Sequence, residues 1–429
     1  MPDFDDAIRA YLDGQAEQMA EMLAQFVRIP TVNPYSGDPR PAGEAAGQRF
    51  LQALMREAGG VTSFLPVPAD IYGRAGILGP RERSWSGREN LIGRFRFGDG
   101  AGHTIVLNGH MDTIGVSDFE GDAFTGRREG DLIHGRGASD CKGGLIAGIF
   151  ALKALRALEI PLRCHVLFQS VVDEECNGGG AGTLACCLAG VTGRYCLALD
   201  GPRGLLYTGC QGVATVEITV RGRAGHGSMG GVSAVDKLLL VKGALDQLKA
   251  ERARTHPGYA VNVGALRAGL APWTVPNHGW LTANINYTRE EMIEQPDGHG
   301  AAVRERLEAL IAEICREDEW LREHAPEILW VKDLPAFGSA DTATPADFDV
   351  LAAAAEEALT IAAGAPPQRA DLPAWADAVH LSRTGRMPVA GMGAGEPGAS
   401  HTATEYNRLS NVLHSAAAVA MTVIRLDGQ

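Results

Sequence analysis

The chain has 429 residues, 45% of them hydrophobic, and a chain of this length is expected to form two domains. Its formal net charge of −13 argues against nucleic acid and anionic membrane surfaces as partners. The N-terminus has no apolar signal core, and no apolar run approaches the ~18 residues of a membrane span, so we expect a cytoplasmic protein with no membrane partner.

In the first half of the chain, apolar residues at helical spacing give way to compact apolar strands. The segments expected to be helical lie at 4–28, 43–58 and 143–158. The segments expected to be strands lie at 90–97, 104–112, 162–173 and 195–200. A strand, a helix and a strand in this order form a crossover unit, which predicts an α/β fold with a mostly parallel mixed sheet flanked by helices.

The sequence pattern changes after Gly212. A strand of alternating polarity is followed by an amphipathic helix, two strands, a second amphipathic helix and a last strand, at 215–222, 232–251, 259–269, 279–288, 300–317 and 327–333. This self-contained β-α-β-β-α-β segment, residues 212–333, is the candidate inserted α+β domain.

The last part of the chain predicts a helix at 349–363, a loop and helix at 366–384, a Gly-rich strand and turn at 388–398 and a final helix at 407–426. His401 in this part has to meet His110 in space if both bind metal. The first domain, residues 1–211 and 334–429, is therefore expected to be discontinuous, with the insert looped out of it.

Six side chains that can bind a metal ion or move a proton stand where apolar runs end at Gly-rich or polar turns. They are His110, Asp140, Glu174, Glu175, Asp200 and His401. This placement predicts that they gather at one rim of the sheet. Two imidazoles and three carboxylates are enough to hold two divalent ions, with zinc, manganese or cobalt as candidates, and they leave Glu174 as a base. A metal pair that activates water indicates a hydrolase rather than a binding module.

Each of these positions also has a purely structural interpretation. In the motif NGHMDT, His110 could be a satisfied surface histidine, although Asp112 lies on the same face of the strand and can accept its ring N–H. Asp140 precedes a helix and could be its N-cap. The pair Glu174-Glu175 could be an acidic turn. Their occurrence together, all at strand ends, favours the metal site.

Several of these motifs resemble one known family. The segments GHMD, GRGASDCKGG, VVDEECNGGGAG, LALDG, GRAGHGS and SHTATE are similar to those of the M20 metallopeptidase and deacylase family, over nearly the whole chain. The resemblance implies that His110 and Asp200 bind one metal ion, while Glu175 and His401 bind the other.

The same resemblance assigns the remaining roles. Asp140 bridges both ions, and the peptide bond that follows it is cis. Glu174 is the general base, and Asp112 orients His110. The inserted domain forms a homodimer, in which His226 reaches the neighbouring subunit's site and steadies the oxyanion.

The residues that usually hold the substrate in this family are replaced here. The family's Asn-Val-Val-Pro reads W-T-V-P, beginning at Trp273, and its D-x-R reads N-I-N, ending at Asn286. Trp273 can stack on a flat substrate, or else it is an interface or core residue. Asn286 occupies the position of the family's arginine, and Arg289 is a candidate substitute cation.

These observations predict a metal-dependent hydrolase that cleaves a C–N bond, by default an amide, of a small polar substrate. An alternative is an aminohydrolase of the nitroanthranilate type, which releases ammonia from an aromatic amine and suits Trp273 and the missing arginine. A third interpretation is a binding protein that keeps the fold, but a pure binder needs no free base such as Glu174. Ammonia release identifies the second, and absence of metal-stimulated turnover favours the third.

Overall fold

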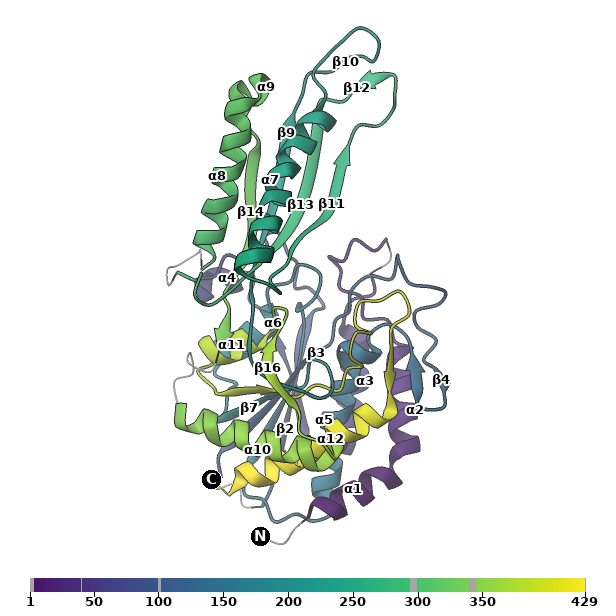
Figure 1. The fold of residues 1–429 in the computed structure, drawn as a ribbon. Coiled ribbons are helices and arrows are strands. Elements are labelled where there is room, and N and C mark those ends of the chain that lie inside the picture. The colour runs from purple at the N-terminus through teal and green to yellow at the C-terminus, as the bar shows by residue number, and fades with distance from the viewer. Residues whose placement is uncertain (1–3, 40, 99–101, 294–298, 339–344, 429) are drawn as a thin grey trace.

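A computed structural model describes residues 4–39, 41–98, 102–293, 299–338 and 345–428 (Figure 1). The chain forms a broad body, which contains both termini, and an elongated part that projects from it (Figure 1). The predicted α/β fold with an inserted domain is confirmed, because the body contains a mixed, mostly parallel sheet and the projecting part contains a separate antiparallel one.

The central sheet has the strand order β1-β2-β6-β3-β7-β17-β8-β15, with β16 paired to β8. Its strands are β1 (Val61–Pro66), β2 (Glu89–Arg96), β3 (Thr104–His110), β6 (His165–Val171), β7 (Tyr195–Ala198), β8 (Leu205–Cys210), β15 (Phe337–Gly338), β16 (Gln368–Leu372) and β17 (Val389–Gly391). Strands β6, β3, β7 and β17 run parallel to one another. Their carboxyl ends therefore meet at one rim of the sheet.

The predicted crossover unit is confirmed, since β3 and β6 are parallel neighbours and α5 lies between them in the chain. The helices of the body are α1 (Asp5–Gly14), α2 (Ala16–Val27), α3 (Ala45–Glu57), α4 (Ile71–Ala75), α5 (Gly143–Ala157), α6 (Ala181–Leu188), α10 (Pro345–Ala363), α11 (Ala378–Arg383) and α12 (Leu409–Asp427). Helix α5 begins with glycines because a Cβ at Gly144 would clash with the carbonyl oxygen of Leu199. This close approach brings the start of α5 to the rim.

Helix α12 corrects one expectation from the sequence. In the described part of the chain it alone is long and apolar enough to cross a membrane, with a mean hydropathy of 1.3. The expectation that no apolar run approaches this length is therefore wrong. The helix is 78% buried in that stretch and packs against α5 and α10, so its composition is that of a core helix.

The inserted domain is built on an antiparallel sheet with the order β11-β13-β9-β14. Its elements are β9 (Gly212–Arg221), α7 (Ala234–Thr255), β11 (Val261–Ala268), β13 (His278–Tyr287), α8 (Ala301–Glu317), α9 (Glu319–Glu323) and β14 (Glu327–Leu334). Along β13 the buried side chains alternate with half-exposed ones. The buried face joins a core with α7 and α8, and the opposite face carries Asn284 and Asn286.

Short elements account for the differences between expectation and structure. Residues 366–384 were expected to be loop and helix, but the first part forms β16, which pairs with β8. Strand β8 itself was not expected, nor was a small sheet of β18 (Tyr406–Arg408), β5 (Leu132–His134) and β4 (Arg127–Glu129). At the tip of the inserted domain, β10 (Gly225–His226) pairs with β12 (Thr274–Val275). Segments this short carry too little periodicity to be seen in a sequence.

Candidate active site

The rim of the central sheet brings together all five predicted metal ligands and Glu174. Three groups of side chains, which share some members, could each hold a metal ion. Within each group the potential ligand atoms lie within 4.8 Å of one another. These groups are His110, Cys141 and Asp200; His110, Glu174 and Glu175; and Asp140, Glu175 and His401. The parallel strands explain this meeting, because β3 ends at His110, β6 ends just before the two glutamates and β7 ends just before Asp200.

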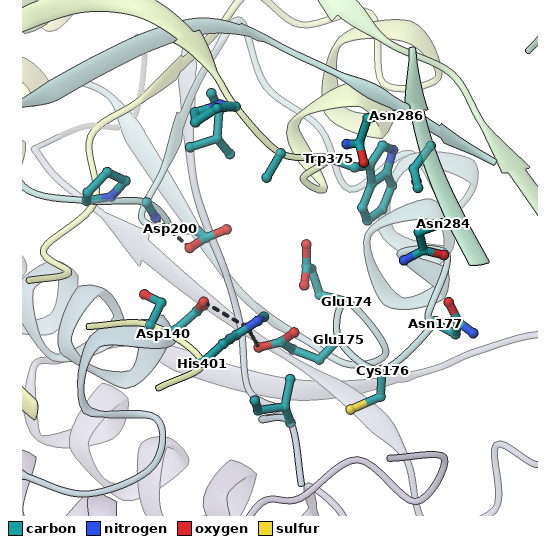
Figure 2. A pocket seen from close by; sticks show the side chains of 18 of the residues that line it. Asp140, Glu174, Glu175, Cys176, Asn177, Asp200, Asn284, Asn286, Trp375 and His401 are labelled. Atoms are coloured by element: carbon teal, nitrogen blue, oxygen red, sulfur yellow. Dashed lines mark hydrogen bonds and ion pairs between the residues drawn. The ribbon is translucent and has the colours of Figure 1, made fainter. Parts of the chain in front are cut away.

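The geometry places Asp140 between the two histidines. Oδ1 of Asp140 lies 2.9 Å from Nε2 of His110, and Oδ2 lies 3.4 Å from Nε2 of His401. The same nitrogen of His401 lies 2.9 Å from Oε1 of Glu175 (Figure 2). Each oxygen of Asp140 thus faces a different imidazole, which is the arrangement a carboxylate needs to bridge two cations.

Asp112 contacts His110 as expected from the sequence, but through a different atom. Nδ1 of His110 lies 2.9 Å from the backbone carbonyl oxygen of Asp112, whereas the carboxylate of Asp112 is 3.8 Å away. A carbonyl can only accept, so Nδ1 carries the proton and Nε2 is left to bind metal. Asp112 does orient His110, but through its main chain.

The carboxylate of Asp112 instead holds the loop that carries the two glutamates. It accepts hydrogen bonds from the backbone N–H of Glu174 at 3.2 Å and of Glu175 at 3.1 Å. The side chain of Asn33 donates to it at 2.7 Å. This buried carboxylate therefore fixes the backbone of Glu174 and Glu175.

A second buried carboxylate, Asp173, anchors the same loop from behind. Arg83 and Arg88 donate to its Oδ1 at 2.8 and 3.2 Å, and the hydroxyl of Tyr72 donates to Oδ2 at 2.9 Å. The backbone is left-handed at Asp173 (φ 69°) and at Cys176 (φ 58°), which is uncommon for residues other than glycine. These bonds hold the loop in a conformation it would seldom adopt alone.

Glu405 braces the loop that carries Asp140. Its Oε1 accepts from the backbone N–H groups of Gly137, Ser139 and Asp140 at 3.1, 3.0 and 3.2 Å. Its Oε2 accepts from Arg136 at 2.7 Å. The peptide bond after Asp140 is cis, as the family resemblance implied. Glu405 lies within the motif SHTATE, but the motif alone did not indicate its role.

The chemistry of the cluster fits divalent metal ions. Burial raises the pKa of Asp200 to about 6 and holds that of Glu174 well above the usual carboxyl range. Buried carboxylates that carry charge need a cation beside them. Two imidazoles with three carboxylates form a donor set that suits zinc or manganese. The carboxylate of Glu174 makes no hydrogen bond to any described residue.

A cavity of about 580 Å³ opens between this rim and the inserted domain. Asp140, Asp200 and His401 line one side, and Asn284, Asn286 and Trp375 line the other, with Glu174 between them (Figure 2). Lys332 of β14 also lines the cavity. The site is thus enclosed by residues of both domains.

The structure separates the other residues expected to bind substrate. Asn286 lines the cavity, but Arg289 does not, and it packs against Gly338 instead. Trp273, with 68% of its surface exposed, and His226 lie at the tip of the inserted domain. There the backbone N–H of Gly227 donates to the carbonyl of Trp273 at 3.0 Å. These two residues do not line the cavity of their own chain.

Lys332, Trp375 and Asn284 were not assigned to the site from the sequence. Lys332 falls in the strand EILWVKD, and it is buried in the structure. A lysine that follows apolar residues in a strand was the feature of the sequence that could have pointed to it. Trp375 lies in a segment assigned to loop and helix. Asn284 was noted only as part of a replaced motif.

The fold combines an α/β sheet with an inserted domain, and histidines and carboxylates gather at the rim of the sheet. These features are those of a metallohydrolase that acts on amide or peptide C–N bonds. The chain belongs to peptidase family M20/M25/M40, whose sequence pattern matches residues 106–425. Members of this family typically bind divalent metals.

Relatives of known name support this assignment. The chain is 28% identical over 350 residues to an N-formyl-4-amino-5-aminomethyl-2-methylpyrimidine deformylase of Halalkalibacterium halodurans, covering 76% of this chain and 74% of the relative. The di-peptidase Dug1p from Saccharomyces cerevisiae has a similar structure, with a TM-score of 0.78, 14% identity and full coverage of both chains. Human carnosine dipeptidase 1 matches with a TM-score of 0.75, 15% identity and the same coverage. At these identities the two structures show the fold alone.

Proposed function

We propose that this protein uses a pair of divalent metal ions, zinc or else manganese or cobalt, to hydrolyse the amide bond of a small N-acylated amine. The observation that carries the proposal is the carboxylate of Glu174. It faces the cavity beside five potential ligands, and it has no partner among the described residues. The contacts among the described residues give the Glu174 carboxylate no role in stabilising the fold, whereas a hydrolase needs a general base at this position.

The ligand allocation follows the family resemblance and the contacts of Asp140. His110 and Asp200 would hold one ion, Glu175 and His401 the other, and Asp140 would bridge them. This division is supported by the two oxygens of Asp140, each of which faces a different histidine.

When bound, such a metal pair supplies Lewis acidity that polarises the acyl oxygen and lowers the pKa of water. Glu174 takes a proton from the attacking water and returns it to the leaving nitrogen, a contribution of about 10²–10⁴-fold. Asp112 and Asp173 hold Glu174 in place through the loop that carries it. The cavity places these groups between the two domains.

The deformylase relative supports a small N-acyl group on an amine that carries a flat ring. That relative's name describes a formyl group on an aminomethylpyrimidine. The loss of the family's arginine at Asn286 argues against an ordinary carboxypeptidase substrate. Trp375, which lines the cavity, offers an aromatic side chain beside the reacting groups.

We also propose a homodimer through the inserted domain, with His226 of one subunit stabilising the oxyanion in the other. Large apolar side chains are exposed on the described part of this domain, namely Met229, Leu239, Leu240, Leu266, Leu270, Trp273, Ile293 and Leu329. Exposed apolar groups of this kind mark interaction surfaces. His226 and Trp273 share the tip and would therefore arrive at a partner's site together.

The test is a screen of the purified protein, supplemented with Zn²⁺, Mn²⁺ or Co²⁺, against N-formyl and N-acetyl amines, N-acyl amino acids, dipeptides and aryl amines. Release of amine and of ammonia is measured separately. Metal-dependent amine release from N-acyl amines supports the proposal. Ammonia release from aryl amines alone would establish the aminohydrolase instead, and no turnover with any metal would favour a binding protein.

A further inference from the structure

The wall of the cavity opposite the metal rim presents hydrogen-bond donors without acceptors. Lys332 has only 6% of its surface exposed, and its ammonium donates one hydrogen bond, to the carbonyl of Gly178 at 3.0 Å. An ammonium carries three N–H groups. In the described part of the chain the other two have no acceptor, although Lys332 is close enough to Glu174 to interact with its charge.

The neighbouring side chains on this wall repeat the pattern. Asn284 accepts a hydrogen bond from the Thr215 hydroxyl at 2.6 Å through its Oδ1, and its NH₂ group has no partner among the described residues. The ring of Trp375 lines the cavity, and its Nε1, which is buried beneath the cavity surface, has no partner among the described residues. The side-chain amide of Asn286 also makes no hydrogen bond within the described ranges. Apart from the oxygen of Asn286, every unpaired group of this set is a donor.

Buried polar groups in native proteins are nearly always paired, so unpaired donors that face a cavity call for a ligand that supplies acceptors. From this donor wall of Asn284, Asn286, Lys332 and Trp375, we infer that the protein recognises a planar substrate group whose edge carries several hydrogen-bond acceptors, and that Lys332 is the residue that selects it. The inference rests on the proposed amide hydrolysis, because it assigns the substrate class of that same cavity.

The position of the wall fits this role. Glu174 lies between it and the rim (Figure 2), so a planar group on the wall would leave an attached acylamine pointing toward the base. Lys332 also supplies a cation in place of the arginine that the family resemblance implies. Asn286, at the position of that arginine, lies on β13, and Lys332 lies on β14; both strands are neighbours of β9 in the same sheet. Arg289, the substitute considered from the sequence, lies outside the cavity lining.

Carboxylates and heteroaromatic rings both have planar edges with acceptors, and three formamides distinguish them. N-Benzylformamide has no acceptor on its ring, 4-(formamidomethyl)benzoate has a carboxylate, and 5-(formamidomethyl)pyrimidine has neutral ring nitrogens. The expected result for the metal-loaded wild type is a kcat/KM at least about tenfold higher for one acceptor-bearing formamide than for N-benzylformamide. Whichever compound is preferred identifies the edge, and no preference for either overturns the inference.

The decisive comparison is Lys332→Met beside Lys249→Met, which makes the same chemical change at an exposed position of the inserted domain outside the cavity. Lys332→Met should reduce the ratio of kcat/KM between the preferred formamide and N-benzylformamide to about threefold or less, and Lys249→Met should leave it unchanged. An unchanged ratio in Lys332→Met overturns the inference. Should Lys332→Met fail to fold, Asn286→Leu is judged by the same ratio, because the side chain of Asn286 makes no hydrogen bond to any described residue.

Calorimetric binding of the matching amines, benzylamine, 4-(aminomethyl)benzoate and 5-(aminomethyl)pyrimidine, separates this inference from the proposed function. If no formamide is hydrolysed but an acceptor-bearing amine binds in a manner that needs Lys332, the inference stands and amide hydrolysis fails. If formamides are hydrolysed without any dependence on Lys332, the function stands and the inference fails. If the acceptor-bearing amines bind no better than benzylamine, and their formamides are hydrolysed no faster than N-benzylformamide, the inference is overturned.

Discussion

The metal rim and the donor wall face each other across one cavity, but they differ in how far the hydrogen bonds of their polar groups are satisfied. On the rim, the ligand loops are fixed by buried partners, as Asp112 fixes Glu174 and Glu405 fixes Asp140. On the wall, Trp375 and Lys332 carry donors that no described residue satisfies. A rim fixed in advance suits a reaction whose geometry must not vary. A wall with unmet donors suits recognition of a group that only the substrate supplies.

The two regions also differ in their relation to the family. The rim keeps the family motifs, whereas the wall carries Asn286 at the position where the family resemblance implies an arginine. We therefore expect that substitutions in the rim change the rate of the reaction and that substitutions in the wall change which substrate is preferred.

The largest effect is expected at the centre of the rim. Glu174→Gln should lower kcat by about 10²–10⁴-fold, because glutamine cannot accept a proton from water. Metal content and thermal stability should stay near those of the wild type, since no described residue bonds to this carboxylate. Steady-state kinetics beside metal analysis measure both. Glu313→Gln, at an exposed position, is the control, and near-normal turnover of Glu174→Gln would remove it as the base.

The next effect tests whether the tip of the inserted domain completes a partner's rim. His226→Ala should lower activity by about 10²–10³-fold, as loss of an oxyanion donor does. Mixed in equal amounts with Glu174→Gln, it should recover roughly a quarter of wild-type activity, since half the dimers then hold one intact site. No recovery after proven subunit exchange would mean that His226 acts in its own chain or has no role.

A smaller effect should distinguish the two metal positions. His401→Ala should lower the affinity for one ion by at least ~10–100-fold, while the ion at His110 is retained. A loss of this size is typical when a residue that only hydrogen-bonds to a metal ligand is removed, so removal of a ligand itself should cost at least as much. Mass spectrometry and metal titration measure the occupancy of each position. Equal loss of both ions would contradict the allocation, and so would retention of both.

The smallest effect is expected at Trp273. Trp273→Asn should shift preference from flat aromatic toward aliphatic amides by less than about tenfold, since this exposed side chain would reach a site only in the partner subunit of the proposed dimer. Competition between paired substrates measures the shift. An identical substrate profile would return Trp273 to an interface role.

The rim was predictable from the sequence because strand ends in a parallel sheet converge, and His110, Asp140 and Asp200 each mark such an end or the turn beside it. The donor wall was not predictable from the sequence. Lys332 and Trp375 come from distant segments, and their proximity depends on how β14 packs over the body. The sequence predicted Asp112 as the partner of His110, but it could not predict which oxygen of Asp112 makes the contact. A carbonyl and a carboxylate of the same residue, Asp112, cannot be told apart in a sequence.

The most direct test of the separation between reaction and substrate compares one variant from each region over one panel of formamides. Glu174→Gln should slow every compound by a similar factor, and Asn286→Leu should change their order of preference. Relative kcat/KM values for the panel provide the measurement. A common slowing of all compounds by Asn286→Leu, or a changed order with Glu174→Gln, would contradict the account.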